Sequence, residues 1–197
     1  MKDIDSPAHV RQATEADAPA IADIQARNMN EALSSFLGDA TWAHSILAQA
    51  LDPQKMTEQW QRSLLEPPKD TQGVFVAALG PQIVGFLAFT PANVDQHLDE
   101  EHPLSHLPAE VEISALEVSQ EYGRQGHASR LMAAVTETLR QRGISRIQTW
   151  VLQGAQPHIR FLTQVGFAPA GLRRGFEVGD QQLFEMCWYT NISEGDS

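Results

Sequence analysis

The sequence predicts a mixed α/β fold, with a mostly antiparallel central sheet flanked by helices. A strand, a glycine-bearing turn and a helix follow one another between Glu112 and Gly143. A hairpin pattern precedes them, because two apolar, β-branched-rich runs at 73–79 and 83–89 flank a Gly-Pro turn. Helical and extended patterns alternate after Gly143, as is typical of a sheet covered by helices.

The chain opens with a short strand at 10–14 and an amphipathic helix. Thr14 with Asp17, or Asp17 with the proline that follows it, caps this helix. A helix-prone stretch at 41–65 comes next. The Asp-Pro pair at 52–53 divides it into two helices, because a proline disfavours helical geometry in the residue before it.

The helix after the glycine turn has an apolar face, and Gly143 stands behind it as a typical helix end. The face consists of Leu131, Met132, Val135 and Leu139. The elements expected around this helix are strands at 112–118 and 144–152, a helix at 157–165, and strands from Phe167 and at 182–189. The predicted order is therefore β-α-α-β-β-β-α-β-α-β-β.

Length and composition indicate one globular domain. The chain has 197 residues, of which 42% are hydrophobic and 20% charged. We expect a single domain over 1–197, with its core at 8–190 and a loose tail at 191–197. The N-terminus lacks an apolar signal region, and no apolar run approaches the roughly 18 residues of a membrane span. The single cysteine, Cys187, cannot form an internal disulfide, so we expect a cytoplasmic protein without membrane contact.

The formal net charge of −11 argues against nucleic acid as a partner, because phosphate backbones select basic surfaces. The charge suits a cationic substrate, and it equally suits a protein that is acidic only for solubility.

The turn from Gly123 to Ala128 has the chemistry of a phosphate cradle. A turn that leads directly into a helix leaves backbone N–H groups without partners, and the helix dipole favours an anion at the same place. Small residues let a diphosphate approach that backbone closely. The chain contains neither a P-loop motif nor the glycine pattern of dinucleotide-binding folds. The plain alternative is a tight connection between strand and helix.

The turn and the strand before it resemble the acyl-CoA site of the GCN5-related N-acetyltransferase (GNAT) superfamily. Leu116-x-Val118 and Gly126-x-Ala128 match its signature, whereas Gly123 replaces the usual Gln or Arg and Arg124 follows one place later. The Gly-Phe pair at 166–167 and the opening segment at 10–17 also look like that family, so the resemblance covers most of the chain.

The resemblance implies a GNAT fold, with the sheet splayed at the acyl-CoA site, and acetyl-CoA as co-substrate without a metal. It implies that the backbone of Leu116, Glu117 and Val118 pairs with the pantetheine arm. The residues expected at the pyrophosphate are Arg124, Gln125, Gly126, His127, Ala128 and Ser129.

Acetyl transfer to an amine needs a base, and the resemblance places Glu112 in that role. By period-two alternation Glu112 shares a sheet face with Ser114 and Leu116. Glu110 and Glu117 are competitors, and an ordinary surface glutamate is the alternative reading.

The resemblance fails at the leaving-group acid. Leu162 occupies the position where many family members have a tyrosine, and it cannot donate a proton. Either the thiolate leaves unaided, or another residue protonates it. The candidates are Tyr122, His127, His158 and Tyr189.

A long non-periodic segment lies between Thr90 and Glu110. It is either a functional lid or a solvated acidic loop. Its histidines, at 97, 102 and 106, have spacings that match no specific metal site, so we expect no metal.

The predicted function is an N-acetyltransferase that moves an acetyl group from acetyl-CoA to a primary amine by direct attack in a ternary complex. The acceptor is a small molecule or a peptide, and the sequence does not name it. The alternatives are a CoA-binding protein without transferase activity and a peptide or protein N-terminal acetyltransferase. The resemblance also allows a homodimer.

Overall fold

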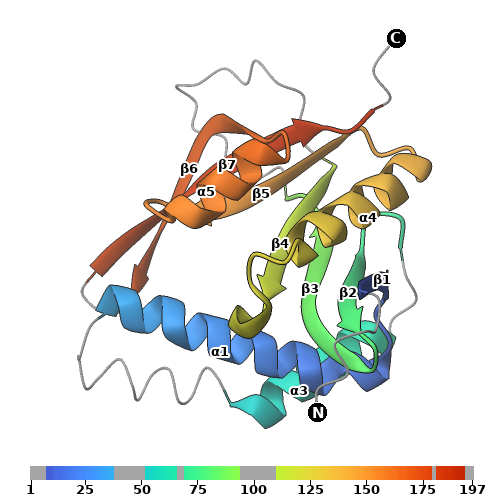
Figure 1. Cartoon of the computed structure of the whole chain (residues 1–197). Coiled ribbons are helices and arrows are strands. Elements are labelled where there is room, and N and C mark those ends of the chain that lie inside the picture. The colour runs from blue at the N-terminus through green and yellow to red at the C-terminus, as the bar shows by residue number, and fades with distance from the viewer. Residues whose placement is uncertain (1–7, 38–51, 66–68, 94–109, 179–180, 194–197) are drawn as a thin grey trace. The chain divides into compact units, whose positions relative to one another are not determined.

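The computed structural model describes residues 8–37, 52–65, 69–93, 110–178 and 181–193 (Figure 1). Its strands and helices follow the predicted order. The strands are β1 (Ala8–Gln12), β2 (Gly73–Leu79), β3 (Gln82–Pro91), β4 (Val111–Val118), β5 (Arg146–Leu152), β6 (Ala168–Val178) and β7 (Gln181–Asn191). The helices are α1 (Ala18–Leu37), α3 (Pro53–Leu65), α4 (His127–Gln141) and α5 (Gln156–Gln164), with 3₁₀ turns η1 (Glu15–Asp17) and η2 (Gln120–Tyr122).

The strands form one sheet in the order β1-β2-β3-β4-β5-β7-β6. β4 and β5 run parallel, whereas β1 with β2, β5 with β7 and β6 with β7 run antiparallel. The predicted fold class, a mostly antiparallel sheet with flanking helices, is confirmed. The register that joins β4 to β5 covers Val111–Ile113 and Ile147–Thr149.

Several element boundaries differ from the prediction. β1 begins and ends two residues early, because its register with β2 runs from Ala8 opposite Leu79 to Gln12 opposite Phe75. β7 includes Asn191, and Ile192 after it is buried, so the ordered chain extends past the expected start of the tail.

The chain divides into two compact units, and each is described by itself. The first contains 73–87 and 115–134 together with the N-terminal helices. There Trp60 of α3 packs edge-on against Phe86 of β3, with ring centroids 5.3 Å apart. The Trp60 indole N–H donates to Gln25 of α1 at 2.9 Å. One aromatic side chain thus joins α3 to both β3 and α1.

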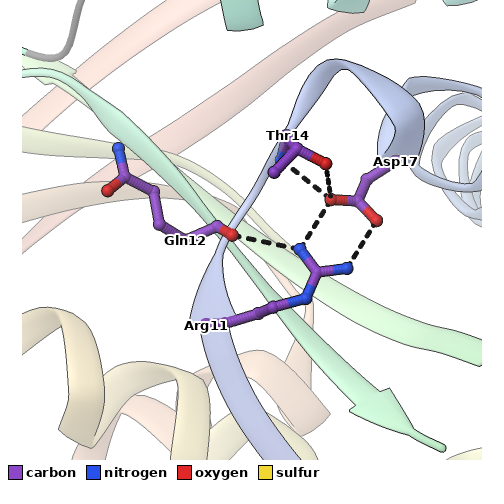
Figure 2. A network of polar contacts seen from close by, with 4 residues as sticks. All are labelled: Arg11, Gln12, Thr14 and Asp17. Carbon is purple, nitrogen blue, oxygen red and sulfur yellow. Dashed lines mark hydrogen bonds and ion pairs between the residues drawn. The ribbon is translucent and has the colours of Figure 1, made fainter. Parts of the chain in front are cut away.

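The start of α1 is fixed by a polar network around Asp17, which is buried (Figure 2). Arg11 of β1 donates two hydrogen bonds to its carboxylate, at 2.7 and 2.8 Å. The Thr14 backbone N–H and hydroxyl donate two more, at 2.8 and 2.9 Å. These bonds, led by those from Arg11, lower the pKa of Asp17 to about 2. The predicted Thr14–Asp17 cap is confirmed, and Arg11 adds an ion pair to it.

The second unit contains 70–72, 88–114 and 135–197. The end of α4 has two cap bonds. Gly143 adopts a φ of 79°, its N–H donates to Arg140, and the N–H of Ile144 donates back to Leu139. This is the Schellman arrangement that a glycine behind a helix predicts. Because Ile144 completes it, β5 begins at Arg146 and not at Ile144 as expected.

The helix predicted in the first part of 41–65 and the segment with His97, His102 and His106 fall largely or wholly outside the described residues. None of the helices described is both long enough and apolar enough to span a membrane.

Candidate functional site

The glycine turn leads into α4 with two residues in the left-handed region. Arg124 has a φ of 61° and Gly126 a φ of 79°. Left-handed residues next to right-handed ones turn successive backbone N–H groups toward one point, which makes a concavity for an anion. A non-glycine residue in this region costs about 1 kcal/mol, and such strain is concentrated at functional sites.

The turn supplies several hydrogen-bond donors. The carbonyl of Gly126 accepts from the N–H of Arg130, which closes the first turn of α4. Within the described parts of the chain, the backbone N–H groups of residues 124–129 have no partner. These groups sit at a helix N-terminus, where the dipole adds positive potential. The predicted residues 124–129 therefore place a group of backbone donors without partners at the start of α4, an arrangement that suits an anion.

Arg130 also lies at this turn, and it was not among the candidate residues expected from the sequence. Its guanidinium Nη1 donates to the carbonyl of Gln125 at 2.9 Å. A Cβ built on Gly126 would stand 3.5 Å from the same nitrogen. Arg130 thus folds back over the turn and, with Arg124, gives it two cationic side chains. Its place four residues after Gly126 was the available signal, because residues i and i+4 share a helix face.

His127, which was expected to contact the ligand, has a buried side chain, with 3% of it exposed. The ring meets Tyr122 edge-on, with centroids 6.4 Å apart. Neither ring nitrogen has a hydrogen-bond partner among the residues described. Burial, together with the charge of Arg130, lowers the pKa of His127. Burial therefore favours the neutral imidazole, and the backbone N–H of His127 is the group that could serve an anion at the turn.

The end of β4, predicted to pair with a pantetheine arm, is held by α1 and β3. Asn28 of α1 donates to the Glu117 carboxylate at 2.6 Å and to the carbonyl of Val118 at 3.2 Å. A Cβ built on Gly85 of β3 would lie 2.8 Å from the carbonyl oxygen of Glu117. The backbone of Glu117 and Val118 is thus fixed from two sides.

A cavity of about 170 Å³ lies beside this strand end, between α1 and η2. Its charged lining residues are Asp23, Arg27, Glu31 and Glu121. Arg27 pairs with Asp23 at 3.0 Å. Three carboxylates and one guanidinium give the lining a net negative charge.

Glu112 lies on β4 in the second unit and is half-buried. Its Oε2 accepts a hydrogen bond from Gln148 Nε2 at 3.0 Å and another from the Trp150 indole N–H at 3.1 Å. Both donors come from β5, where Gln148 is the register partner of Glu112. These two bonds fix the orientation of the Glu112 carboxylate. Sequence reasoning missed both donors. The alternating pattern of β5 predicts that Gln148 and Trp150 share a face of the sheet, but it does not predict that they contact Glu112.

The two competing glutamates have other contacts. Glu110 accepts hydrogen bonds from the backbone N–H and the hydroxyl of Ser145, and the hydroxyl bond in particular lowers the pKa of Glu110. Glu117 accepts from Asn28, as described above. Glu110 thus fixes the segment before β5, and Glu117 fixes β4 against α1.

The candidate proton donors differ in their surroundings. Leu162, at the usual tyrosine position, is buried in α5. Tyr122 donates its hydroxyl to Gln82 at 3.0 Å. Tyr189 is covered by the guanidinium of Arg146, 5.1 Å from its ring centroid. His158 is exposed on α5. None of these contacts identifies a leaving-group acid.

Cys187 is buried in β7. Burial, together with the charge of Glu112, raises the pKa of its thiol to about 12, and the charge of Arg174 opposes the shift. A thiol of this kind is not a nucleophile at neutral pH. In the described part of the chain no group of three or more His, Cys, Asp or Glu side chains is placed to hold a metal ion.

The comparison with family models gives one match, to the acetyltransferase (GNAT) family over residues 35–167. No curated protein matches the chain in sequence at the significance required.

Solved structures with the same fold are numerous. The PaiA N-acetyltransferase of Thermoplasma acidophilum, in complex with coenzyme A, has a TM-score of 0.61 and 14% identity, over 92% of this chain and 98% of its own. YncA of Salmonella typhimurium, solved with its cofactor acetyl-CoA, has a TM-score of 0.58 and 14% identity over 96% of each chain. The ribosomal-protein-alanine N-acetyltransferase of Brucella melitensis has a TM-score of 0.61 and 21% identity, over 93% of this chain and 99% of its own.

Proposed function

Because the chain belongs to the acetyltransferase (GNAT) family, we propose that it transfers an acetyl group from acetyl-CoA to a primary amine by direct attack in a ternary complex. The turn at 124–129 carries the proposal. Its backbone donors, its left-handed residues and the two arginines beside it suit the diphosphate of a CoA molecule.

The pantetheine arm would pair with the backbone of Leu116, Glu117 and Val118, in the manner of an added strand. Two observations support this assignment. The register between β4 and β5 ends at Ile113, before these residues. Asn28 and Gly85 fix the carbonyl side of the strand end, so its position is defined before a ligand arrives. A backbone N–H near Leu116 would then polarise the thioester carbonyl.

In the proposed reaction the amine nitrogen attacks the thioester carbonyl carbon, so that a C–N bond forms and the C–S bond breaks. Glu112 takes the proton that the amine must lose. Its support is the pair of hydrogen bonds on Oε2, which orient the carboxylate. The thiolate leaves unaided and takes a proton from water, because Leu162 cannot supply one and a CoA thiol is acidic enough to leave as the anion.

The acceptor is a small-molecule or peptide amine. A cationic amine suits the net charge of −11 and the carboxylate-lined cavity beside α1. The homodimer and the cytoplasmic location stay predictions from the sequence.

The test is an acceptor screen with the purified chain. Acetyl-CoA is offered with a panel of polyamines, amino acids and peptides, and both free CoA and acetylated product are measured. We expect stoichiometric release of CoA and formation of an N-acetyl product with at least one class. Tight CoA binding without turnover on any amine would support a CoA-binding protein instead. Turnover on peptide N-termini alone would assign the peptide-acetylating alternative.

A further inference from the structure

The carboxylate of Glu112 is held unevenly. Oε2 accepts both hydrogen bonds, from Gln148 at 3.0 Å and from Trp150 at 3.1 Å. Within the chain as described, no donor contacts Oε1. A carboxylate bound through one oxygen has a fixed orientation and keeps lone pairs available on the other.

Trp150 is itself held by an ion pair on the same face of the sheet. The guanidinium of Arg174 lies over its ring, 4.5 Å from the centroid. Arg174 Nε donates to Glu185 at 2.6 Å, and these two residues are register partners on β6 and β7. Glu185 also pairs in register with Leu152, two residues after Trp150, so all of these side chains share one face.

The contact of Arg174 with the Trp150 ring also affects the indole N–H. A cation over an indole face attracts its π electrons, which makes the N–H a stronger donor. Arg174 can therefore act on Glu112 through Trp150 without contacting it. Among the described residues, Cys187, the register partner of Trp150, also interacts with this cluster, and its raised pKa keeps it a neutral thiol.

We propose that Trp150, oriented by Arg174, is a positioning residue that anchors Oε2 of Glu112, so that Oε1 receives the proton of the acceptor amine. Gln148 provides the second anchor. The inference rests on the proposed function, in which Glu112 is the base. It adds three residues that act on the base from β5 and β6, and no contact between these residues and a substrate is required.

The kinetic test compares Trp150→Phe, Arg174→Met and Arg174→Lys, with the best amine from the acceptor screen. Trp150→Phe removes the N–H and keeps a ring under Arg174. Losing a donor disfavours the ionised carboxylate, so the acidic limb of the kcat/KM profile should move to higher pH by about 0.5–1 unit. We expect kcat at neutral pH to fall about 3–10-fold and the Kd for CoA to stay within about twofold. Arg174→Met should give a smaller shift in the same direction, and Arg174→Lys should restore most of it.

A double variant and a matched control exclude a general structural effect. If Arg174 acts through Trp150, adding Arg174→Met to Trp150→Phe should produce no further shift in the profile. Arg173 is the control, because its guanidinium stacks on Phe184 at 5.1 Å and alternation directs it to the other face of β6. Arg173→Met should leave the profile unchanged.

A spectroscopic test needs no acceptor. The chain has 4 tryptophans, so ¹⁵N-tryptophan labelling gives a short set of indole N–H resonances, and Trp150→Phe identifies one of them. We expect that resonance to titrate in the acidic range, and its titration to disappear in Glu112→Gln. Two results would overturn the positioning role alone. One is an indole resonance that does not titrate. The other is a Trp150→Phe pH profile equal to that of the unmodified protein, when Glu112→Gln is inactive. Full activity of Glu112→Gln would instead overturn the base assignment and this inference with it.

Discussion

Gly85 of β3 approaches the carbonyl oxygen of Glu117 so closely that a Cβ at position 85 would lie 2.8 Å from it. The contact is with backbone, which cannot move aside as the end of a flexible side chain can. The absence of a side chain at Gly85 therefore sets the position of Glu117 and Val118, the residues proposed to pair with the pantetheine arm.

Gly85→Ala should displace the end of β4 and weaken CoA binding. We expect the Kd measured by calorimetry to rise about tenfold, and the free energy of unfolding to fall by about 1–3 kcal/mol, as is usual for overpacking. Gly175→Ala is the matched control. Its Cβ would meet the ring of Phe184 at 3.2 Å, a side chain that can shift, so its CoA affinity should be unchanged. Equal Kd values for the two variants would contradict the assignment of the strand end.

Gly126→Ala should weaken CoA binding at least about tenfold, which corresponds to roughly 1.4 kcal/mol. The new methyl group would occupy the surface that the diphosphate is proposed to contact. Both this variant and its control, Gly143→Ala, place alanine at a φ of 79°, so they share a backbone cost of about 1 kcal/mol. Only Gly126 lies in the turn. If calorimetry gave the two variants the same CoA affinity, the anion site would have to lie elsewhere.

Glu112→Gln should lower kcat by about 10²–10⁴-fold and leave CoA affinity unchanged, because it removes the proposed base and keeps an oxygen that can accept from Gln148 and Trp150. Glu110→Gln is the control, since that side chain is exposed and bonds Ser145. Steady-state kinetics at saturating acetyl-CoA measures the effect. A large fall in kcat for Glu110→Gln and none for Glu112→Gln would assign the role of base to Glu110 instead.

Cys187 should react slowly with thiol reagents in the folded protein. Burial and the charge of Glu112 raise its pKa to about 12, so very little thiolate is present at pH 8. Labelling with a chromogenic disulfide should accelerate strongly once the chain is unfolded in urea. Rapid labelling of the native protein would show that β7 opens and exposes Cys187 without global unfolding.

The local features of the site could be predicted from the sequence, because they depend on neighbouring residues. The glycine turn, the apolar face of α4 and the cap at Gly143 each follow from patterns within a few residues. The bonds of Glu112 could not be predicted, because Gln148 and Trp150 are 36 and 38 residues away. Alternation gives the face of each strand, whereas the partner depends on the register between β4 and β5, which is set by tertiary packing.

The Asp17 network likewise contains bonds between neighbouring residues, which the sequence predicts, and bonds that depend on the position of a strand, which it does not. The Thr14–Asp17 cap spans three residues and was predicted. The bonds from Arg11 require β1 to end where it does, and the predicted strand was displaced by two residues.

Asp17→Asn should destabilise the protein in a pH-dependent way. The folded pKa of Asp17, about 2, lies below its ordinary value of 3.8, so its contribution is fully present above pH 3.8 and is lost as the pH falls toward 2. The shift corresponds to about 2 kcal/mol, as an upper value, because Arg11 is 40% exposed and partly screened by water. Urea unfolding should therefore show the variant about 2 kcal/mol less stable at pH 7, with a difference that narrows between pH 4 and pH 2. Asp23→Asn serves as the control, since that carboxylate is exposed in its pair with Arg27 and should change stability little. A stability difference for Asp17→Asn that stays constant from pH 7 to pH 2 would show that its carboxylate charge does not stabilise the start of α1.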